Sequence, residues 1–242
     1  MILFRFLQIA TIITAASCVH AGAASLQVSP VNIDVKAPAM ATTLTLRNFD
    51  VRSANTQIRI FKWIQKDGKD VLEPTQSVVA SPPAATLKPG TDYTVRIVRV
   101  DHSPVSAEES YRLLVDQIPD PATLRYDSVN FGIRYSIPVF FSQSPTAPQI
   151  SWSARVKGGQ LQLTGSNMGE RRLKVSNLSI TNANGQVLNL GDGLLGYILG
   201  MASMQFDSRA MPHGFVSGST LSIGFKGDDG PVKAIATVQK AD

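Results

Sequence analysis

The sequence predicts an all-β protein composed of two immunoglobulin-like β-sandwich domains. Runs of β-branched and aromatic residues recur at short spacing along the 242 residues, and clusters of Gly, Pro, Asn and Asp separate them. Residues 26–141 show no helical period of apolar residues. The polar segment 142–148 (SQSPTAP) has the composition of a linker and divides the chain into two strand-rich parts.

The first part contains about seven predicted strands, the number expected for one immunoglobulin-like sandwich. Residues 42–47 (TTLTLR) alternate cleanly, and residues 56–65 (TQIRIFKWIQ) are β-rich. The turn at 66–69 (KDGK) that follows is typical of a hairpin. The other strands are expected at residues 26–35, 78–79, 92–100, 111–117 and 129–141.

The second part restarts the pattern of short strands and turns and predicts a second, smaller sandwich. Turns are expected at Gly158-Gly159, at 167–170 and at 182–185. The apolar, glycine-rich residues 194–201 fit either a helix or a strand, and the sequence leaves this open. The strands are expected at residues 150–157, 160–165, 173–181, 187–190, 204–206, 220–225 and 232–238.

The N-terminus has the features of an export signal. Arg5 precedes an apolar run from 6 to about 16, and Ala21-Gly22-Ala23 fits the rule for cleavage after Ala23. We therefore expect a signal peptide at 1–23, a first domain at 24–144 and a second at 145–242. Because Cys18 is expected to leave with the signal, no disulfide is expected in the mature chain. No later apolar run is long enough to insert into a membrane.

Composition and motifs argue against several classes of function. The formal net charge is only +5 and the basic residues are dispersed, so nucleic acid is not an expected partner. The sequence has no nucleophile, phosphate-loop or zinc-protease motif, and we expect no enzyme activity. No thiol remains in the mature chain and no two histidines lie close in the sequence, so neither a metal site nor a cofactor is expected.

The segment 129–137 carries a continuous apolar face. The residues that alternate onto this face of an extended strand are Val129, Phe131, Ile133, Tyr135 and Ile137. Such a strand either packs in the core of its own sandwich or remains at an edge that can pair with another chain. The pattern alone does not decide between these interpretations.

Five motifs occur in an order that resembles one protein family. They are LTLRN (44–48), IFKW (60–63), SPP with LKPG and VRI (81–97), ESYRL with IP (109–119), and RYSIP (134–138). In this order they resemble the periplasmic chaperones of the chaperone–usher pilus pathway. The resemblance is greatest to the archaic branch, whose subunits are spore-coat-like pilins. It covers residues 26–141, whereas the second part is similar only in size and β character.

The resemblance implies an L-shaped arrangement of the two domains and a function in donor-strand complementation in the periplasm. A pilin lacks the last strand of its own sandwich, and the chaperone supplies one. The strand residues expected to enter the subunit are Val129, Phe131 and Ile133, with Tyr135 and Ile137 as flanks. The implied partners are pilin subunits and an outer-membrane usher. Whether the free protein caps its own strand by forming a homodimer is left open.

One feature departs from the family pattern. Conventional pilus chaperones hold the C-terminal carboxylate of the subunit with an Arg on the first strand and a Lys after the donor strand. The corresponding positions here are Asn32 and Pro138. Arg96 and Arg134 are the candidates for a relocated anchor, because a guanidinium can bind a carboxylate through two hydrogen bonds. Lys62 and Arg59 are weaker candidates.

Two other classes of protein compete with this interpretation. An exported β-sandwich adhesin or structural pilus component would also be all-β, but it should carry its own donor extension, and residues 24–30 are too short for one. A secreted hydrolase is disfavoured because the nucleophile motif is missing.

Overall fold

A computed structural model describes residues 26–119, 132–143, 146–157, 159–208 and 214–239. All regular elements of these residues are β-strands, arranged in three sheets. The signal peptide predicted at 1–23 and the domain boundary predicted between 144 and 145 lie outside the described residues. Among the described residues, no helix is long and apolar enough to cross a membrane.

Two sheets of residues 26–142 form the first sandwich. One sheet has the order β1 (Leu26–Ser29), β3 (Ala41–Asn48), β8 (Asp92–Arg99), β6 (Val78–Ser81). The other has the order β2 (Ile33–Lys36), β10 (Arg134–Ser142), β9 (Glu109–Ile118), β4 (Ala54–Lys66), β5 (Lys69–Pro74), and β7 (Ala84–Leu87) also pairs with β4.

The alternation seen in the sequence sets the core of this sandwich. Leu44 and Leu46 on β3 and Val95 and Ile97 on β8 are fully buried, and the residues between them face outward. Val115 on β9 belongs to the same buried cluster, together with inward residues of β4 and β10. Burying side chains of this size contributes about 1.5–3 kcal/mol each. The predicted alternating strands are therefore amphipathic strands with one face in a common core.

The second domain is a seven-stranded sheet folded on itself. Its order is β14 (Val187–Ile198), β13 (Leu173–Thr181), β16 (Thr220–Lys226), β17 (Pro231–Gln239), β11 (Ile150–Lys157), β12 (Gln160–Asn167), β15 (Ala202–Asp207). A short parallel pairing of β11 with β17 joins the two layers. The two ends of the path, β14 and β15, approach each other. The sheet therefore encloses one apolar core.

The structure settles the segment that the sequence left open. Strand β14 continues to Ile198, so the first half of residues 194–201 is strand. Its pairing with β13 shifts register between Val175 and Ser179. Glycines in β14 leave positions without side chains, which removes the strict alternation that identifies other strands.

A third apolar cluster lies where the two domains meet. It consists of Trp63 on β4, Phe140 on β10, and Tyr197 and Leu199 from the second domain. The rings of Trp63 and Tyr197 meet edge to face with centroids 5.6 Å apart. Trp63 and Phe140 have centroids 5.9 Å apart. Because all four residues are buried, the domains share a dry contact and are not only tethered by the linker.

A buried arginine adds charge pairing to this contact. Arg172 of the second domain forms ion pairs with Glu108 and Asp34 of the first. Its guanidinium carbon lies 3.5 Å from the ring centroid of Phe140. The Arg172 side chain is only 3% exposed. A buried charge requires partners of this kind, since an unpaired one is strongly destabilising.

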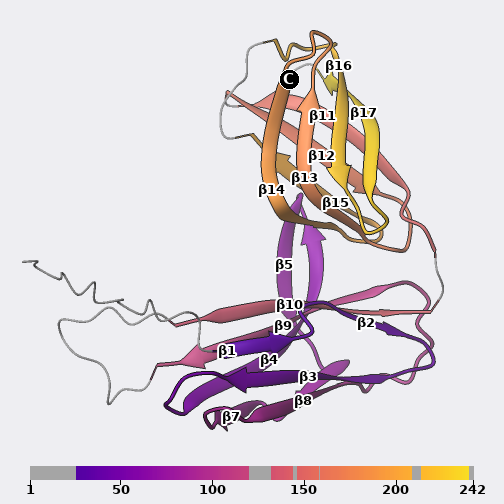
Figure 1. The fold of residues 1–242 in the computed structure, drawn as a ribbon. Helices are drawn as coiled ribbons and strands as arrows, with labels where there is room; N and C mark the ends of the chain where they lie inside the picture. Colours follow the sequence, from indigo (N-terminus) through magenta and orange to yellow (C-terminus); the bar gives the residue numbers. More distant parts are fainter. Residues whose placement is uncertain (1–25, 120–131, 144–145, 158, 209–213, 240–242) are drawn as a thin grey trace, which may run out of the picture.

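The β4–β5 hairpin reaches from the first domain to the second (Figure 1). The Gln65 amide donates to the carbonyl of Tyr197 at 2.8 Å and accepts from the backbone of Leu199 at 3.0 Å. At the tip, the carbonyl of Gly68 accepts from the backbone of Gln205 at 3.0 Å. Gly68 has φ +71°, and a Cβ there would lie 2.9 Å from the Cβ of Gln205, so glycine is required for this approach.

These contacts fix the arrangement of the two domains. Figure 1 shows the strands of the first domain running across the view and those of the second running along it, with β5 standing between them. The two sandwiches therefore form the L shape that the family resemblance implied.

The neighbouring residues Glu108 and Glu109 form ion pairs with different domains. Whereas Glu108 pairs with Arg172 of the second domain, Glu109 accepts two hydrogen bonds from Arg99, at 2.9 and 2.8 Å. Tyr111 also donates to Glu109, at 3.0 Å. Burial tends to raise the pKa of Glu109, but the hydrogen bonds from Arg99 and Tyr111 and the positive charge of Arg99 outweigh it, so its pKa is lowered.

Replacing Trp63 should loosen the contact between the domains. Trp63→Ala is expected to lower the free energy of unfolding by about 3–5 kcal/mol, because it leaves a cavity in the shared cluster. Urea denaturation measures this change. Leu72→Ala is the matched control, because Leu72 pairs with Trp63 across the hairpin yet is 39% exposed. A loss as small as that of the control would show that the cluster does not stabilise the fold.

Glu109→Gln should lower stability at pH 7 by about 1.5–3 kcal/mol, the range for hydrogen bonds to charged groups. Because the folded-state pKa of Glu109 is lowered, its contribution is present above the unfolded-state pKa of about 4.3 and is lost as pH falls through the folded value. The variant should therefore lose less stability between pH 5 and pH 3 than the native protein. Thermal melts across this range test the prediction.

Glu73→Gln serves as the control for this pH series. Glu73 pairs with Lys66 at 2.8 Å, but both side chains are well exposed. Exposed pairs contribute about 0–1 kcal/mol, so the Glu73 variant should keep the native pH dependence. A Glu109→Gln protein with a pH profile like that of the native chain would contradict the assigned role of Glu109.

Candidate functional site

Strand β10 is paired to different extents on its two sides. On one side, Arg134 to Phe141 pair with β9. On the other side, β2 pairs only with Val139 to Ser142. Within the described part of the chain, the outer edge of residues 134–138 is therefore unpaired. An unpaired edge of this length presents backbone donors and acceptors to which another chain can add a strand.

The described residues of the predicted donor segment keep the expected alternation. Ile137 is 2% exposed and belongs to the core of the first sandwich. Tyr135 is half-buried against that core, and its hydroxyl donates to the carbonyl of Leu26 on β1. Ile133 is half-buried and precedes the strand, and its carbonyl accepts from the backbone of Gln117 at 2.9 Å. Val129 and Phe131 lie outside the described residues.

The opposite face of β10 belongs to the outer surface of its sheet. Arg134 faces Asp116 on β9 directly in the register, and the two form an ion pair. Asp116 also accepts from Arg59 on β4 at 2.7 Å. One carboxylate thus joins two guanidinium groups from the strands on either side. Although burial tends to raise the pKa of Asp116, the hydrogen bonds from Arg134 and Arg59 outweigh that effect and lower it.

These three charged groups line a shallow hollow of about 450 Å³ on the outer face of the sheet. Asp116 is the only acidic residue of the lining. The other residues around the hollow are Gln57, Gln117, Gly132 and Ile133. Because the lining carries two cations and one anion, the hollow electrostatically favours an anionic group. Ile133 also lines the hollow, so the hollow lies beside the start of β10.

Arg96 occupies a different surface from Arg134. It lies on β8 between Val95 and Ile97, both of which point into the core, so its own side chain points away from the core and is exposed. This surface is the outer face of the other sheet. No acidic side chain of the described residues forms an ion pair with Arg96. The structure therefore does not bring Arg96 and Arg134 together.

Lys62, a weaker candidate for the anchor, is largely withdrawn from solvent. Its ammonium nitrogen lies 4.6 Å from the ring centroid of Tyr111. Desolvation by burial lowers the pKa of Lys62, although the charge of Glu109 acts in the opposite direction. Arg59, by contrast, keeps 40% of its side chain exposed. The sequence indicated that Arg59 points away from the core, since it lies between the apolar residues Ile58 and Ile60. Alternation alone does not show that Asp116 and Arg134 lie beside Arg59 on the same face of the sheet.

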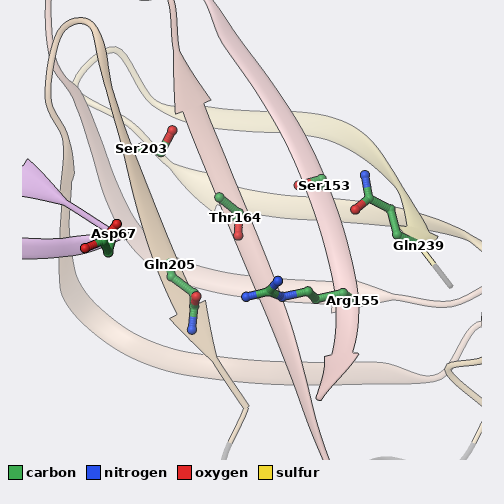
Figure 2. A pocket seen from close by; sticks show the side chains of 8 residues that line it. Asp67, Ser153, Arg155, Thr164, Ser203, Gln205 and Gln239 are labelled. Carbon is green, nitrogen blue, oxygen red and sulfur yellow. The ribbon is translucent and has the colours of Figure 1, made fainter. Parts of the chain in front are cut away.

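A second polar hollow, of about 370 Å³, forms where the tip of the β4–β5 hairpin meets β15 (Figure 2). Thr164, Gln205 and Arg155 line it from neighbouring strands, and Asp67 approaches from the hairpin. Arg155 already donates to Gln162 at 2.9 Å. No group of His, Cys, Asp or Glu suited to a metal ion occurs in the described part of the chain. This hollow is a polar groove beside the contact between the domains.

Comparison with known proteins identifies the class to which this fold and edge belong. The family model described as "Pili and flagellar-assembly chaperone, PapD N-terminal domain" matches residues 25–147. The chain therefore belongs to this family of chaperones, which is not a family of enzymes. The resemblance predicted from the sequence motifs is confirmed. A search of curated proteins gave no match.

Solved structures match this chain over both domains. The CsuC–CsuE chaperone–tip adhesion subunit complex of archaic Csu pili from Acinetobacter baumannii matches with a TM-score of 0.69 and 26% identity, covering 90% of this chain and 100% of that chain. The SafA pilin in complex with the SafB chaperone from Salmonella enterica matches with a TM-score of 0.58 and 18% identity, covering 87% and 96%. The two-domain immunoglobulin-like fold predicted from the sequence is thus confirmed.

Proposed function

We propose that this protein is a periplasmic chaperone that captures pilin subunits by lending them a strand and delivers them to an outer-membrane usher. The observation that carries this proposal is the unpaired edge of β10 at residues 134–138 in a chain of the pilus-assembly chaperone family. The similar structures from Acinetobacter and Salmonella include a chaperone bound to an adhesion subunit and one bound to a pilin. Their partners are the reason for proposing subunits of this class here.

The donor strand would act through backbone and side chains together. Its free edge supplies hydrogen bonds, while alternate side chains enter the open core of the subunit. We assign the inserted positions to Val129, Phe131 and Ile133. Each buried side chain of this kind contributes about 1.5–3 kcal/mol. Tyr135 and Ile137 flank the inserted residues and are partly or fully covered by the chaperone itself, so they would anchor the strand at its base.

Such a chaperone needs no cofactor or chemical step. It holds an aggregation-prone edge until the N-terminal extension of another subunit replaces the donor strand. In this exchange, the backbone hydrogen bonds and apolar contacts made by the donor strand are replaced by those of the incoming extension. In the absence of a subunit, two copies of the chain can cover each other's free edges, which is the homodimer left open by the sequence.

Phe131→Arg should abolish subunit capture while the chaperone stays folded. The substitution would place a charge without a partner in the subunit's core. Co-purification from periplasm with a co-expressed pilin encoded beside the chaperone measures the effect, and the expected yield of complex is close to zero. Circular dichroism of the variant checks that its β structure is retained.

Thr43→Arg provides the control for an added charge. Thr43 is exposed on β3, on the outer face of the other sheet, and this variant should capture the subunit at the native yield. Equal yields for Phe131→Arg and the native protein would show that the donor assignment is wrong.

A further inference from the structure

Two strand edges lie at the open side of the first sandwich. One is the outer edge of residues 134–138 on β10, which β2 leaves uncovered because it pairs only from Val139 onward. The other belongs to β1, the terminal strand of the opposite sheet. Backbone groups at such edges can pair with an added strand. What joins the two edges therefore affects which of them a partner can use.

One side chain crosses from the first edge to the second. Tyr135 on β10 points into the sandwich, as Ile137 and Val139 do, and its ring packs against their buried core. Its hydroxyl donates a hydrogen bond to the carbonyl of Leu26, the first residue of β1. This contact ties the start of β10 to the opposite sheet, and we call it the Tyr135 tether.

The carbonyl of Leu26 is not used by its own sheet. Leu26 lies opposite Asn48 on β3, and the carbonyl of Asn48 accepts from the backbone of Gly90 at 2.8 Å, on the side of β8. Residues directly opposite in an antiparallel pair exchange either both backbone hydrogen bonds or none. Leu26 and Asn48 therefore exchange none, and the carbonyl of Leu26 points away from β3. Tyr135 satisfies an acceptor that otherwise lies at the open edge.

Burial along β10 changes at Tyr135. Every residue from Ile137 to Phe141 is buried, whereas Arg134 and Ser136 on either side of Tyr135 are exposed. Tyr135 itself is half-buried against the core of the chaperone, and Ile133 does not belong to that core cluster. Moving Tyr135 into another core would break the tether and leave its hydroxyl without this partner, which is costly for a buried polar group.

We infer that Tyr135 is a positioning residue for the lent strand, because it fixes the start of β10 to β1 and makes Ile133 the last residue that can enter a subunit. This inference rests on the proposed function. The first half of β10 has backbone support from β9 on one side only. Ordering a strand on binding costs conformational entropy, and a strand that is already ordered avoids this cost. The Tyr135 tether supplies a second point of support from the opposite sheet.

Hydrogen exchange in the full chain without a subunit tests this role. Gln117 donates to the carbonyl of Ile133 at 2.9 Å, so the alternate pairs that follow place the amides of Tyr135 and Ile137 toward β9. Tyr135→Phe keeps the ring and removes the donor. In this variant the two amides should exchange about fivefold faster, as expected for the loss of one neutral hydrogen bond. Buried amides of β8 in the opposite sheet should keep their native rates.

Tyr93→Phe is the matched control for this measurement. Tyr93 is also half-buried against the same core, but it lies on β8, and its hydroxyl has no hydrogen-bond partner among the described residues. The control variant should leave exchange on β10 unchanged. Native exchange rates of the Tyr135 and Ile137 amides in the Tyr135→Phe protein would overturn the inference, as would an equal acceleration in both variants.

Capture of a co-expressed pilin tests the consequence for binding. Tyr135→Phe should weaken capture about fivefold, and Tyr93→Phe should bind with native affinity. If Tyr135 itself entered the subunit, phenylalanine would bind at least as well, because no hydroxyl would then be buried in an apolar core. Native or higher affinity of the Tyr135→Phe protein would therefore overturn the inference.

Phe131→Arg separates this test from that of the proposed function. Loss of capture in Phe131→Arg together with native capture in Tyr135→Phe would refute the positioning role and leave the proposed function standing. Native capture in both variants would contradict the proposed function and, with it, the role of Tyr135 in capture. The exchange rates would then decide only whether the tether orders the strand.

Discussion

The first domain depends on strand β10, whose two halves are paired differently. Its second half pairs on both sides and its first half on one side only. Val139 and Phe141 complete the core of the first sandwich, and Phe140 on the opposite face joins the contact between the domains. The first half of β10, which has one free edge, is therefore held in an extended conformation by its pairing with β9 and by the second half, which is paired on both sides.

The contact between the domains gives this strand a rigid base. Trp63 and Phe140 pack against Tyr197, while Arg172 crosses the boundary to two carboxylates. Gln65 adds hydrogen bonds from the hairpin to the backbone of the second domain. Because these contacts combine apolar burial, charge pairing and backbone hydrogen bonds, the angle between the two sandwiches is specified by several independent interactions.

Charge is distributed unevenly over the outer faces of the first sandwich. The β4–β9–β10 face concentrates Arg59 and Arg134 around Asp116, next to the unpaired edge. On the other face, Arg47 is matched by Asp92, and Arg96 stands apart from any described acidic partner. Only the first arrangement combines two cations, a shared anion and an adjacent strand edge.

The sequence by itself determined the all-β class and most of the strands, because alternation shows which side chains face a core. It also determined the family, because the five motifs occur in the same order as in that family. It also indicated Ile133, Tyr135 and Ile137 as one face of a strand. The sequence did not determine the fate of residues 194–201, since their glycines remove the alternation. The tertiary structure alone decided which edge of β10 is free and which arginines meet. Arg59 and Asp116 are 57 residues apart in the chain, and only the pairing of β4 with β9 brings them into contact. Strand pairing is a long-range interaction, so the period of a single strand determines its faces but not its neighbours.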